Sequence, residues 1–457
     1  MKNKFLLLCL TALAVLAFSC SDDSDDVKKE EDDDQPPVGE TRGMNIQDAQ
    51  SLVLLGPAPN GRIGDVRPAY TPNLYKITEG GSMEVVKFLD AQGNVIDTKE
   101  AGTNVLVRWI TPMNDEYVAL TGDFVFPDSI STKHYTTLLL RKTDGAIFDF
   151  TQGGLVPPWK RLGEAVVKAD GAGNLYYLTM DNAAGSVKKL DVSNPQQPAV
   201  SGYTSTGQEA RYFEMDAHGN CLYKYGESGG VTQANGTADL RIRKANGGIF
   251  EVKVDGRDNR EAWLGNNGSF YFITYTWDNG YLPAIHRITI TGSEIAINTV
   301  WSANDDLDVN DAVGSMMRTE SQGAYMIRKE NSVVFVDTYF NRNLHWEFFE
   351  EDNTVRKFEL PQVEEGALLV YSERYYYIAS GTNLYKVDLD THAYESLLPE
   401  NAYEVYTMNV SADDVVQFSA MRFSDGKKIV AEISAAGALT VVSEELEAAA
   451  IVLQRLN

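Results

Sequence analysis

Three segments of the chain place a tryptophan among polar residues that can form hydrogen bonds. They are Leu155–Arg161, Thr276–Tyr281 and Tyr339–Trp346, and each lies between stretches whose composition favours β-strands. An indole in a loop either packs on the base of that loop or offers its face to a ligand, and sugar rings stack well on such faces. We therefore predict a carbohydrate site, with core packing as the alternative for the tryptophans. The predicted ligand-binding residues are Trp159, Trp277, Tyr281, Tyr339, Arg342 and Trp346.

An acidic segment gathers oxygen ligands at alternate positions. Within Asn304–Asp311, the side chains of Asp306, Asp308 and Asn310 follow an Asp-x-Asp-x-Asn order that resembles the start of an EF-hand calcium loop. The resemblance ends there, because the sixth position is not glycine and the twelfth is not glutamate. A solvated acidic loop is the favoured interpretation. These three residues are the candidate Ca²⁺ ligands, and no other cofactor is indicated.

Signatures of catalytic chemistry are scarce. The five histidines show no metal-binding spacing, and the chain has neither a Gly-x-Ser-x-Gly turn nor a glycine-rich phosphate loop. Cys221 lies in a strand pattern beside Leu222 and Tyr223, which predicts a buried and unreactive thiol. No catalytic residue is predicted, although dispersed catalytic carboxylates would escape recognition in a single sequence.

The strands that must position these residues follow a repeated hairpin pattern. In Ala165–Leu178, two runs rich in β-branched and aromatic residues flank a turn of Gly and Asn, and looser copies recur around Asp216 and Asn266. The strands group in fours at a spacing of roughly 40–55 residues, which is typical of propeller blades. Each unit leaves apolar strand faces that only a neighbour can cover, and a closed ring covers them all. The units span residues 105–151, 165–203, 210–254, 261–301, 316–360, 367–398 and 405–442.

The two ends of the chain predict how the ring closes. Leu74–Ile77, Met83–Leu89 and Asn94–Asp97 form three strands without a first, and Ala450–Leu456 is a lone strand at the other end. Pairing them predicts an all-β fold, a β-propeller of eight four-stranded blades over residues 44–457. Seven blades are the alternative if Ser51–Leu55 is the N-terminal strand, and a two-sheet sandwich with a second domain is another.

Loop lengths predict where a site would lie on such a ring. The loops inside the first hairpin of each unit are short, whereas connections between hairpins and between units are often longer. Alternating strand direction places these two classes at opposite ends of the ring. Because binding sites concentrate on loops held by a rigid scaffold, the face with the long connections is the expected functional face.

The N-terminus has the order of a secretory signal followed by a tether. Lys2 and Lys4 precede an apolar run from Phe5 to Phe18, and Ser19 and Cys20 follow it, with an acidic stretch from there to Pro37. The segment before Cys20 resembles the lipobox of bacterial lipoproteins, although Phe18 replaces a small residue. The acidic stretch resembles the export signal of Bacteroidetes surface lipoproteins, and the chain as a whole resembles lipoprotein β-propellers.

That resemblance implies a signal peptide over residues 1–19, lipidation of Cys20, and a flexible tether over residues 20–43. It also implies a location on the outer membrane, facing the cell exterior. The alternatives are an ordinary cleaved signal and a spacer that faces the periplasm.

The charge of the chain limits its partners. Its formal net charge is −25, with 40 Lys and Arg against 65 Asp and Glu, which disfavours nucleic acid and anionic membrane surfaces. Membrane contact is therefore expected only through the lipid anchor, and the oligomeric state is open. The expected function is a binding module that captures a carbohydrate or a protein ligand. The alternatives are a propeller hydrolase or lyase acting on glycans or lactones, and a protein-interaction scaffold in an envelope complex.

Overall fold

The structure is a computed structural model, and a defined set of residues is described in it. These are residues 42–55, 73–90, 92–96, 104–125, 133–151, 154–155, 167–181, 184–207, 213–225, 240–254, 262–277, 281–302, 324–337, 344–359, 367–444, 446 and 448–456. The predicted signal peptide and Cys20 lie outside them, as does the tether apart from its last two residues. Within these ranges, no helix is long and apolar enough to cross a membrane.

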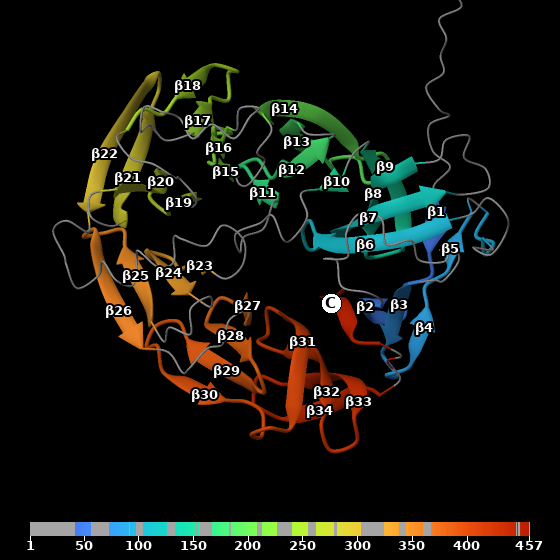
Figure 1. Cartoon of the computed structure of the whole chain (residues 1–457). Helices are drawn as coiled ribbons and strands as arrows, with labels where there is room; N and C mark the ends of the chain where they lie inside the picture. The colour runs from blue at the N-terminus through green and yellow to red at the C-terminus, as the bar shows by residue number, and fades with distance from the viewer. Residues whose placement is uncertain are drawn as a thin grey trace, which may run out of the picture. The chain divides into compact units, whose positions relative to one another are not determined.

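The described strands form eight antiparallel sheets, the blades of a β-propeller (Figure 1), which confirms the predicted fold class and blade number. We number the blades in chain order. Blade 1 consists of β6 (Asn104–Pro112), β7 (Tyr117–Val125), β8 (Lys133–Arg141) and β9 (Ala146–Thr151), and blade 2 of β11 (Val167–Ala169), β12 (Leu175–Asp181), β13 (Ala184–Asp191) and β14 (Ala199–Gly207). Blade 3 consists of β15 (Phe213–Met215), β16 (Cys221–Lys224), β17 (Leu240–Arg243) and β18 (Ile249–Glu251), and blade 4 of β19 (Ala262–Leu264), β20 (Phe270–Trp277), β21 (Tyr281–Thr291) and β22 (Glu294–Ser302).

The other blades follow the same order. Blade 5 consists of β23 (Ala324–Arg328), β24 (Ser332–Asp337), β25 (Leu344–Phe349) and β26 (Thr354–Glu359), and blade 6 of β27 (Leu368–Tyr371), β28 (Tyr375–Ser380), β29 (Asn383–Asp388) and β30 (Tyr394–Ser396). Blade 7 consists of β31 (Tyr403–Val410), β32 (Val416–Arg422), β33 (Lys427–Ile433) and β34 (Leu439–Ser443), and blade 8 of β35 (Ala450–Arg455), β2 (Ala49–Leu55), β3 (Leu74–Thr78) and β4 (Met83–Val85). Three short strands extend two of the sheets. These are β1 (Arg42–Met44) and β5 (Phe88–Leu89) on blade 1, and β10 (Gly154–Leu155) on blade 2.

Blade 8 joins the two ends of the chain. The C-terminal β35 pairs antiparallel with β2, with Val53 opposite Leu453. The prediction of a shared closing blade is therefore correct, and two of its predicted N-terminal strands, β3 and β4, do lie in this blade. The third predicted strand was wrong: Ala49–Leu55 takes its place, and residues 94–96 supply no strand to the blade, while Asp97 lies outside the described residues. The buried Ser51 hydroxyl also donates a hydrogen bond to the buried side-chain oxygen of Gln417, which ties blade 8 to blade 7.

A five-residue turn recurs in the blades and explains the repeated sequence pattern. In Asp170–Asn174, Asp170 Oδ1 accepts hydrogen bonds from the amides of Ala172 and Asn174 at 2.9 and 3.0 Å. Asn174 Nδ2 donates to Asp170 Oδ2 at 2.8 Å, and Gly173 takes the left-handed φ of 78° that the fourth position requires. Asp216 and Asn220 repeat the arrangement. The Asp and Asn side chains thus satisfy backbone groups that the turn leaves unpaired.

The hydrophobic core lies between the blades. Trp263 and Tyr271 of blade 4 stack with ring centroids 5.2 Å apart, and Phe335 and Phe348 of blade 5 meet Trp263 edge to face at 5.7 and 5.9 Å. Aromatic side chains bury large apolar areas and prefer these two geometries. Each blade therefore needs its neighbour, because one face of a sheet is covered only by the next sheet.

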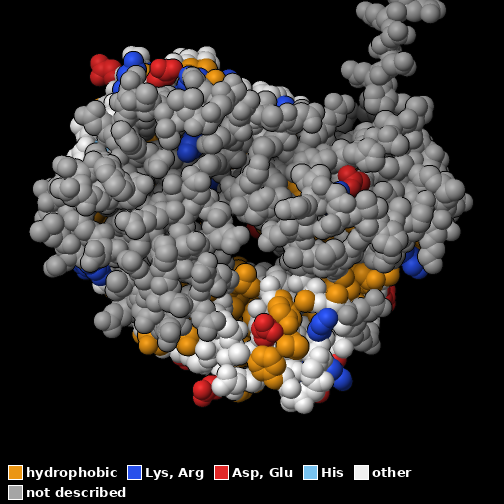
Figure 2. Space-filling view, in the orientation of Figure 1, with side chains coloured by type: hydrophobic (Ala, Val, Ile, Leu, Met, Phe, Trp, Pro, Cys, Tyr) orange, Lys and Arg blue, Asp and Glu red, His pale blue; other side chains and the backbone are white. Residues whose placement is uncertain are grey.

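Strand direction divides the propeller into two faces. The turns that join first to second and third to fourth strands lie at one end of each blade, which we call the turn face; in blade 8, whose first two strands come from opposite ends of the chain, only the turn from third to fourth strand is present. The connections from second to third strand and from blade to blade lie at the other end, the connection face. In Figure 2, hydrophobic side chains gather over the lower part of the view, where Figure 1 places blades 7 and 8, and the described Lys and Arg side chains are scattered.

Candidate functional site

Most residues predicted from the sequence lie outside the described ranges. This holds for Cys20, for Trp159, Tyr339 and Arg342 among the ligand-binding residues, and for the candidate Ca²⁺ ligands Asp306, Asp308 and Asn310. They stay predictions. Among the described residues, no group of three or more His, Cys, Asp or Glu side chains could hold a metal ion.

Trp277 and Tyr281 are strand residues at the connection face of blade 4. Trp277 ends β20, Tyr281 begins β21, and the two are directly paired across the sheet. The predicted long loop over Thr276–Tyr281 is therefore wrong, because only three residues separate the strands. The two residues do lie at the end of the blade where the sequence placed them.

Trp346 is a core residue, and its predicted role in ligand binding is wrong. It lies within β25, its side chain is 1% exposed, and its ring stacks on Phe335 with centroids 3.9 Å apart. The two residues also pair across β24 and β25. An indole enclosed in this way between blades 4 and 5 has no face to offer a sugar.

Cys221 is a buried free thiol, as predicted. Its side chain is 0% exposed, and burial raises its pKa well above the ordinary value. A thiol held in the neutral form is a poor nucleophile. The residue therefore serves packing.

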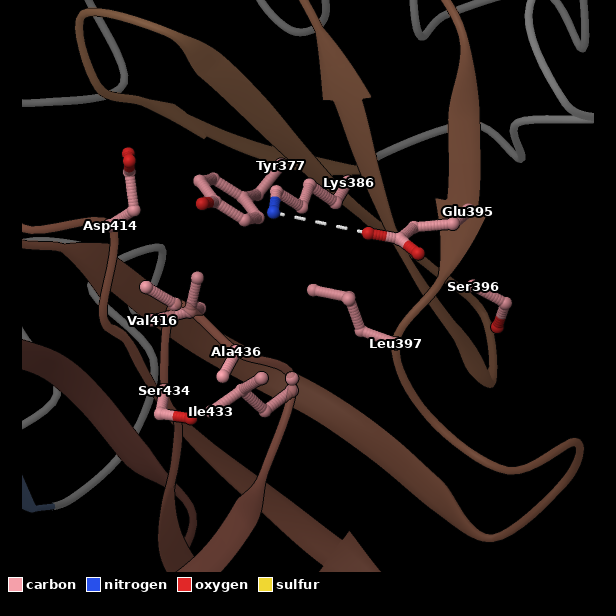
Figure 3. Close-up of a pocket in the computed structure, with 12 residues that line it drawn as sticks. Tyr377, Lys386, Glu395, Ser396, Leu397, Asp414, Val416, Ile433, Ser434 and Ala436 are labelled. Atoms are coloured by element: carbon pink, nitrogen blue, oxygen red, sulfur yellow. Dashed lines mark ion pairs between the residues drawn. The ribbon is translucent and has the colours of Figure 1, made fainter.

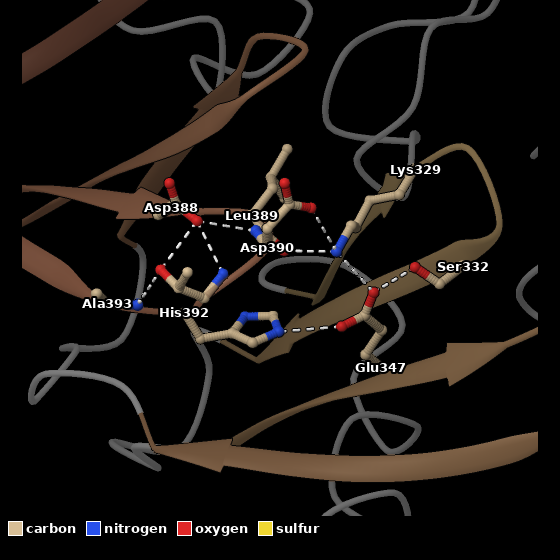
Figure 4. A network of polar contacts seen from close by, with 9 residues as sticks. Lys329, Ser332, Glu347, Asp388, Leu389, Asp390, His392 and Ala393 are labelled. Carbon is tan, nitrogen blue, oxygen red and sulfur yellow. Dashed lines mark hydrogen bonds and ion pairs between the residues drawn. The ribbon is translucent and has the colours of Figure 1, made fainter.

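A buried carboxylate joins blades 5 and 6 (Figure 4). Glu347 of β25 is 1% exposed; Lys329 Nζ lies 3.0 Å from its Oε1, and His392 Nε2 lies 3.0 Å from its Oε2. Ser332 Oγ donates to the same carboxylate. Burial alone would raise the pKa of Glu347, but the hydrogen bonds from His392, Ser332 and Lys329 lower it below its ordinary value.

This group resembles a catalytic triad in composition but not in arrangement. A nucleophilic serine must bond to the imidazole that takes its proton, with the carboxylate on the far side of the ring. Here Ser332 and His392 each bond to Glu347, which is not the order of a triad. His392 is further fixed by its stacking on Phe358, with ring centroids 3.5 Å apart. The observed contacts of the cluster link two blades.

A second buried carboxylate links first strands of three blades. Glu214 of β15 is 2% exposed, and its Oε1 lies 2.9 Å from Lys168 Nζ and 2.7 Å from Arg328 of β23. Figure 1 places β11, β15 and β23 around the middle of the ring. The charges are paired across the centre, so this cluster is also explained by the assembly of the ring.

The turn face holds a cavity between blades 6 and 7 (Figure 3). Its volume is about 250 Å³. Strands β28 to β30 form one wall, and the two turns of blade 7 form the other. The polar and aromatic residues that line it are Tyr377, Lys386, Glu395, Ser396, Asp414 and Ser434.

The charges in this cavity are unequally paired. Lys386 Nζ lies 3.9 Å from Glu395 Oε1 and 3.9 Å from the centroid of the Tyr375 ring. Asp414 Oδ1 is buried, and no hydrogen-bond partner for it occurs among the described residues. Burial, followed by the charge of Asp414, raises the pKa of Tyr377, so this phenol stays protonated. The cavity thus has one cation against two carboxylates.

The turns of blade 7 explain how Asp414 reaches this position. Ser411–Val415 forms the same five-residue turn as Asp170–Asn174, with the amide of Asp414 bonded to the Ser411 carbonyl at 3.1 Å. Asp414 occupies the fourth position with a φ of 59°, where the turn at Ser434 has Gly437 with a φ of 82°. In the sequence, Asp414 lies in one of the short first-hairpin loops and carries no signal of its own. The glycine at the fourth position of the related turns is the pattern from which Asp414 departs.

Comparisons with known proteins assign no family and no activity to this chain. No protein-family model matches the chain, and no curated protein matches it. Similar solved structures include a putative 6-phosphogluconolactonase from Bacteroides uniformis, with 11% identity and a TM-score of 0.41 over 75% of this chain and 99% of that chain. A puromycin hydrolase has 11% identity and a TM-score of 0.40 over 76% of this chain and 54% of that chain. Prolyl oligopeptidase B from Galerina marginata has 13% identity and a TM-score of 0.39 over 61% and 42%. Likeness at this level carries no inference about activity.

Proposed function

We propose that this protein is a lipid-anchored binding module at the cell surface, which captures a carbohydrate in the cavity between blades 6 and 7. The cavity is the observation that carries the proposal. Pockets that bury drug-sized ligands measure about 300–1,000 Å³, so a volume of about 250 Å³ fits a ligand of the size of a single sugar unit.

The lining has the mixture of groups that a sugar requires. Ser396 and Ser434 carry hydroxyls that both donate and accept, Asp414 and Glu395 accept, and Lys386 donates. Tyr377 contributes an aromatic side chain, which suits the C–H groups of a sugar face. Convergent polar groups fix the orientation of a ligand, while the apolar part of the lining contributes burial.

The sequence pattern of an anchor supports the location that we propose for this activity. Cys20 directly follows the predicted signal peptide, and the acidic residues after it have a composition that cannot bury a core. A tether of this kind would hold the propeller away from the membrane while leaving both faces accessible. Capture at the surface is the function that such an arrangement serves.

The proposal is tested with the mature chain on a glycan array, followed by titration of the hits. Ala436 is exposed and lines the cavity, so Ala436→Trp should narrow the entrance and weaken binding about tenfold or more. Ala172 occupies the same third position in the exposed turn of blade 2, so Ala172→Trp is the matched control. If Ala436→Trp leaves the affinity unchanged, the binding site lies outside this cavity. A ligand that is cleaved during the titration, as detected by mass spectrometry, would favour a hydrolase or lyase.

A further inference from the structure

We infer that the cavity between blades 6 and 7 selects a saccharide that carries a protonated amine, and that Asp414 is the residue that recognises it. This inference rests on the proposed function, because it names the class of sugar that the same site takes. Three features of the cavity support it.

The first feature is an uncompensated charge. Of the three charged groups in the lining, Lys386 and Glu395 face each other at 3.9 Å, which leaves Asp414 without a cation. Its Oδ1 is buried and has no donor among the described residues. A buried carboxylate oxygen without a donor is unfavourable, and a ligand ammonium at this point would supply both the donor and the opposite charge.

The second feature is the backbone at Asp414. Its φ of 59° lies in the left-handed region, where equivalent turns in other blades have Gly173, Gly219 and Gly268 with φ between 75° and 80°. Glycine would be the easier residue at this position. An aspartate held there at some conformational expense is consistent with a role for its side chain, since strained residues cluster at ligand sites.

The third feature is the arrangement of the surrounding groups. Figure 3 shows Asp414 on the blade 7 side of the cavity, with Lys386 and Glu395 on the blade 6 side and the Tyr377 ring between Asp414 and Lys386 in this view. A ligand between them meets a carboxylate at one end and an ion pair at the other. An amine at the Asp414 end and hydroxyls toward Glu395, Ser396 and Lys386 would match this pattern.

The test compares three sugars of the same ring size by calorimetric titration: glucosamine, glucose and N-acetylglucosamine. Glucosamine should bind about 10- to 150-fold more tightly than the other two, the range that corresponds to a hydrogen bond between charged groups. In the Asp414→Asn variant, this preference should disappear while the affinity for glucose stays within about threefold. Asparagine tolerates the left-handed backbone, so the turn should be preserved. Asp413→Asn, at an exposed neighbour that does not line the cavity, is the matched control and should bind as the unmodified chain does.

The outcomes separate this inference from the proposed function. Equal binding of glucosamine and glucose, or a preference that survives Asp414→Asn, overturns the inference alone. If none of the three sugars binds, but the array gives a glycan whose binding is abolished by Ala436→Trp, the inference is overturned and the proposed function stands. If Ala436→Trp affects the binding of no glycan, both are overturned. Thermal unfolding of each variant confirms that the blades are intact.

Discussion

Replacing Glu347 by glutamine should destabilise the contact between blades 5 and 6. The carboxylate is 1% exposed and accepts hydrogen bonds from Ser332, Lys329 and His392, so the variant leaves the partly buried Lys329 ammonium without its nearest anion. Removing one partner of a buried ion pair typically costs about 3–5 kcal/mol. Lys329 is 17% exposed and also reaches Asp390 at 3.3 Å, so we expect the lower end, about 3 kcal/mol.

The pH dependence gives this prediction a second readout. The folded-state pKa of Glu347 lies below its ordinary value, so its contribution to stability is complete above that value and is lost as the pH falls through the lowered pKa. The unmodified chain should therefore lose stability relative to Glu347→Gln as the pH falls below about 4.5. His286, whose pKa is lowered to about 4 by burial, also weakens the fold in acid, but it does so in both proteins and cancels in the comparison.

The assay is urea unfolding followed by far-ultraviolet circular dichroism at several pH values. Glu251→Gln is the control, because Glu251 is 57% exposed and its pair with Arg241 at 3.0 Å lies at the surface, where such pairs contribute about 0–1 kcal/mol. The reasoning would be refuted if Glu347→Gln lowered the free energy of unfolding by less than about 1 kcal/mol. It would also be refuted if the difference in stability between this variant and the unmodified chain did not become smaller in acid.

Three other predictions follow from the ends and the surface of the molecule. Leu453 lies in the closing strand β35 and its side chain is 4% exposed, so Leu453→Ala should lower the free energy of unfolding by about 2–5 kcal/mol in the same urea assay. An unchanged unfolding midpoint would mean that contacts outside this strand close the ring. Cys20→Ser should release the protein from the membrane fraction, since stable anchoring needs the acyl chains that this residue would carry, and continued fractionation with membranes would contradict lipidation there. Trp277→Ala, at the connection face, should leave glycan binding within about threefold, because the cavity lies on the turn face, and a roughly ten- to hundredfold loss would place the site at the connection face instead.

The turns and the strand count could be predicted from the sequence because they depend on local interactions. An aspartate that caps its own turn, as Asp170 does, needs only residues within the next four positions, so the pattern is visible in any stretch that contains it. Alternating apolar strands between such turns then repeat at the spacing of propeller blades. The shared closing blade followed from the unpaired strands at both ends, although the sequence alone could not tell whether residues 49–55 or residues 94–97 would join it.

Which side chains face a ligand was decided by the tertiary structure. Trp346 lies between polar residues in the sequence, yet the pairing of its strand turns the ring toward Phe335 and into the core. The cavity brings together Tyr377 and Ser434 from different blades, and the buried Glu347 meets His392 from the next blade. The chain determines the face on which each strand side chain lies, with a period of two. Only the neighbouring blade determines whether that face is covered, paired with a charge, or left open to a ligand.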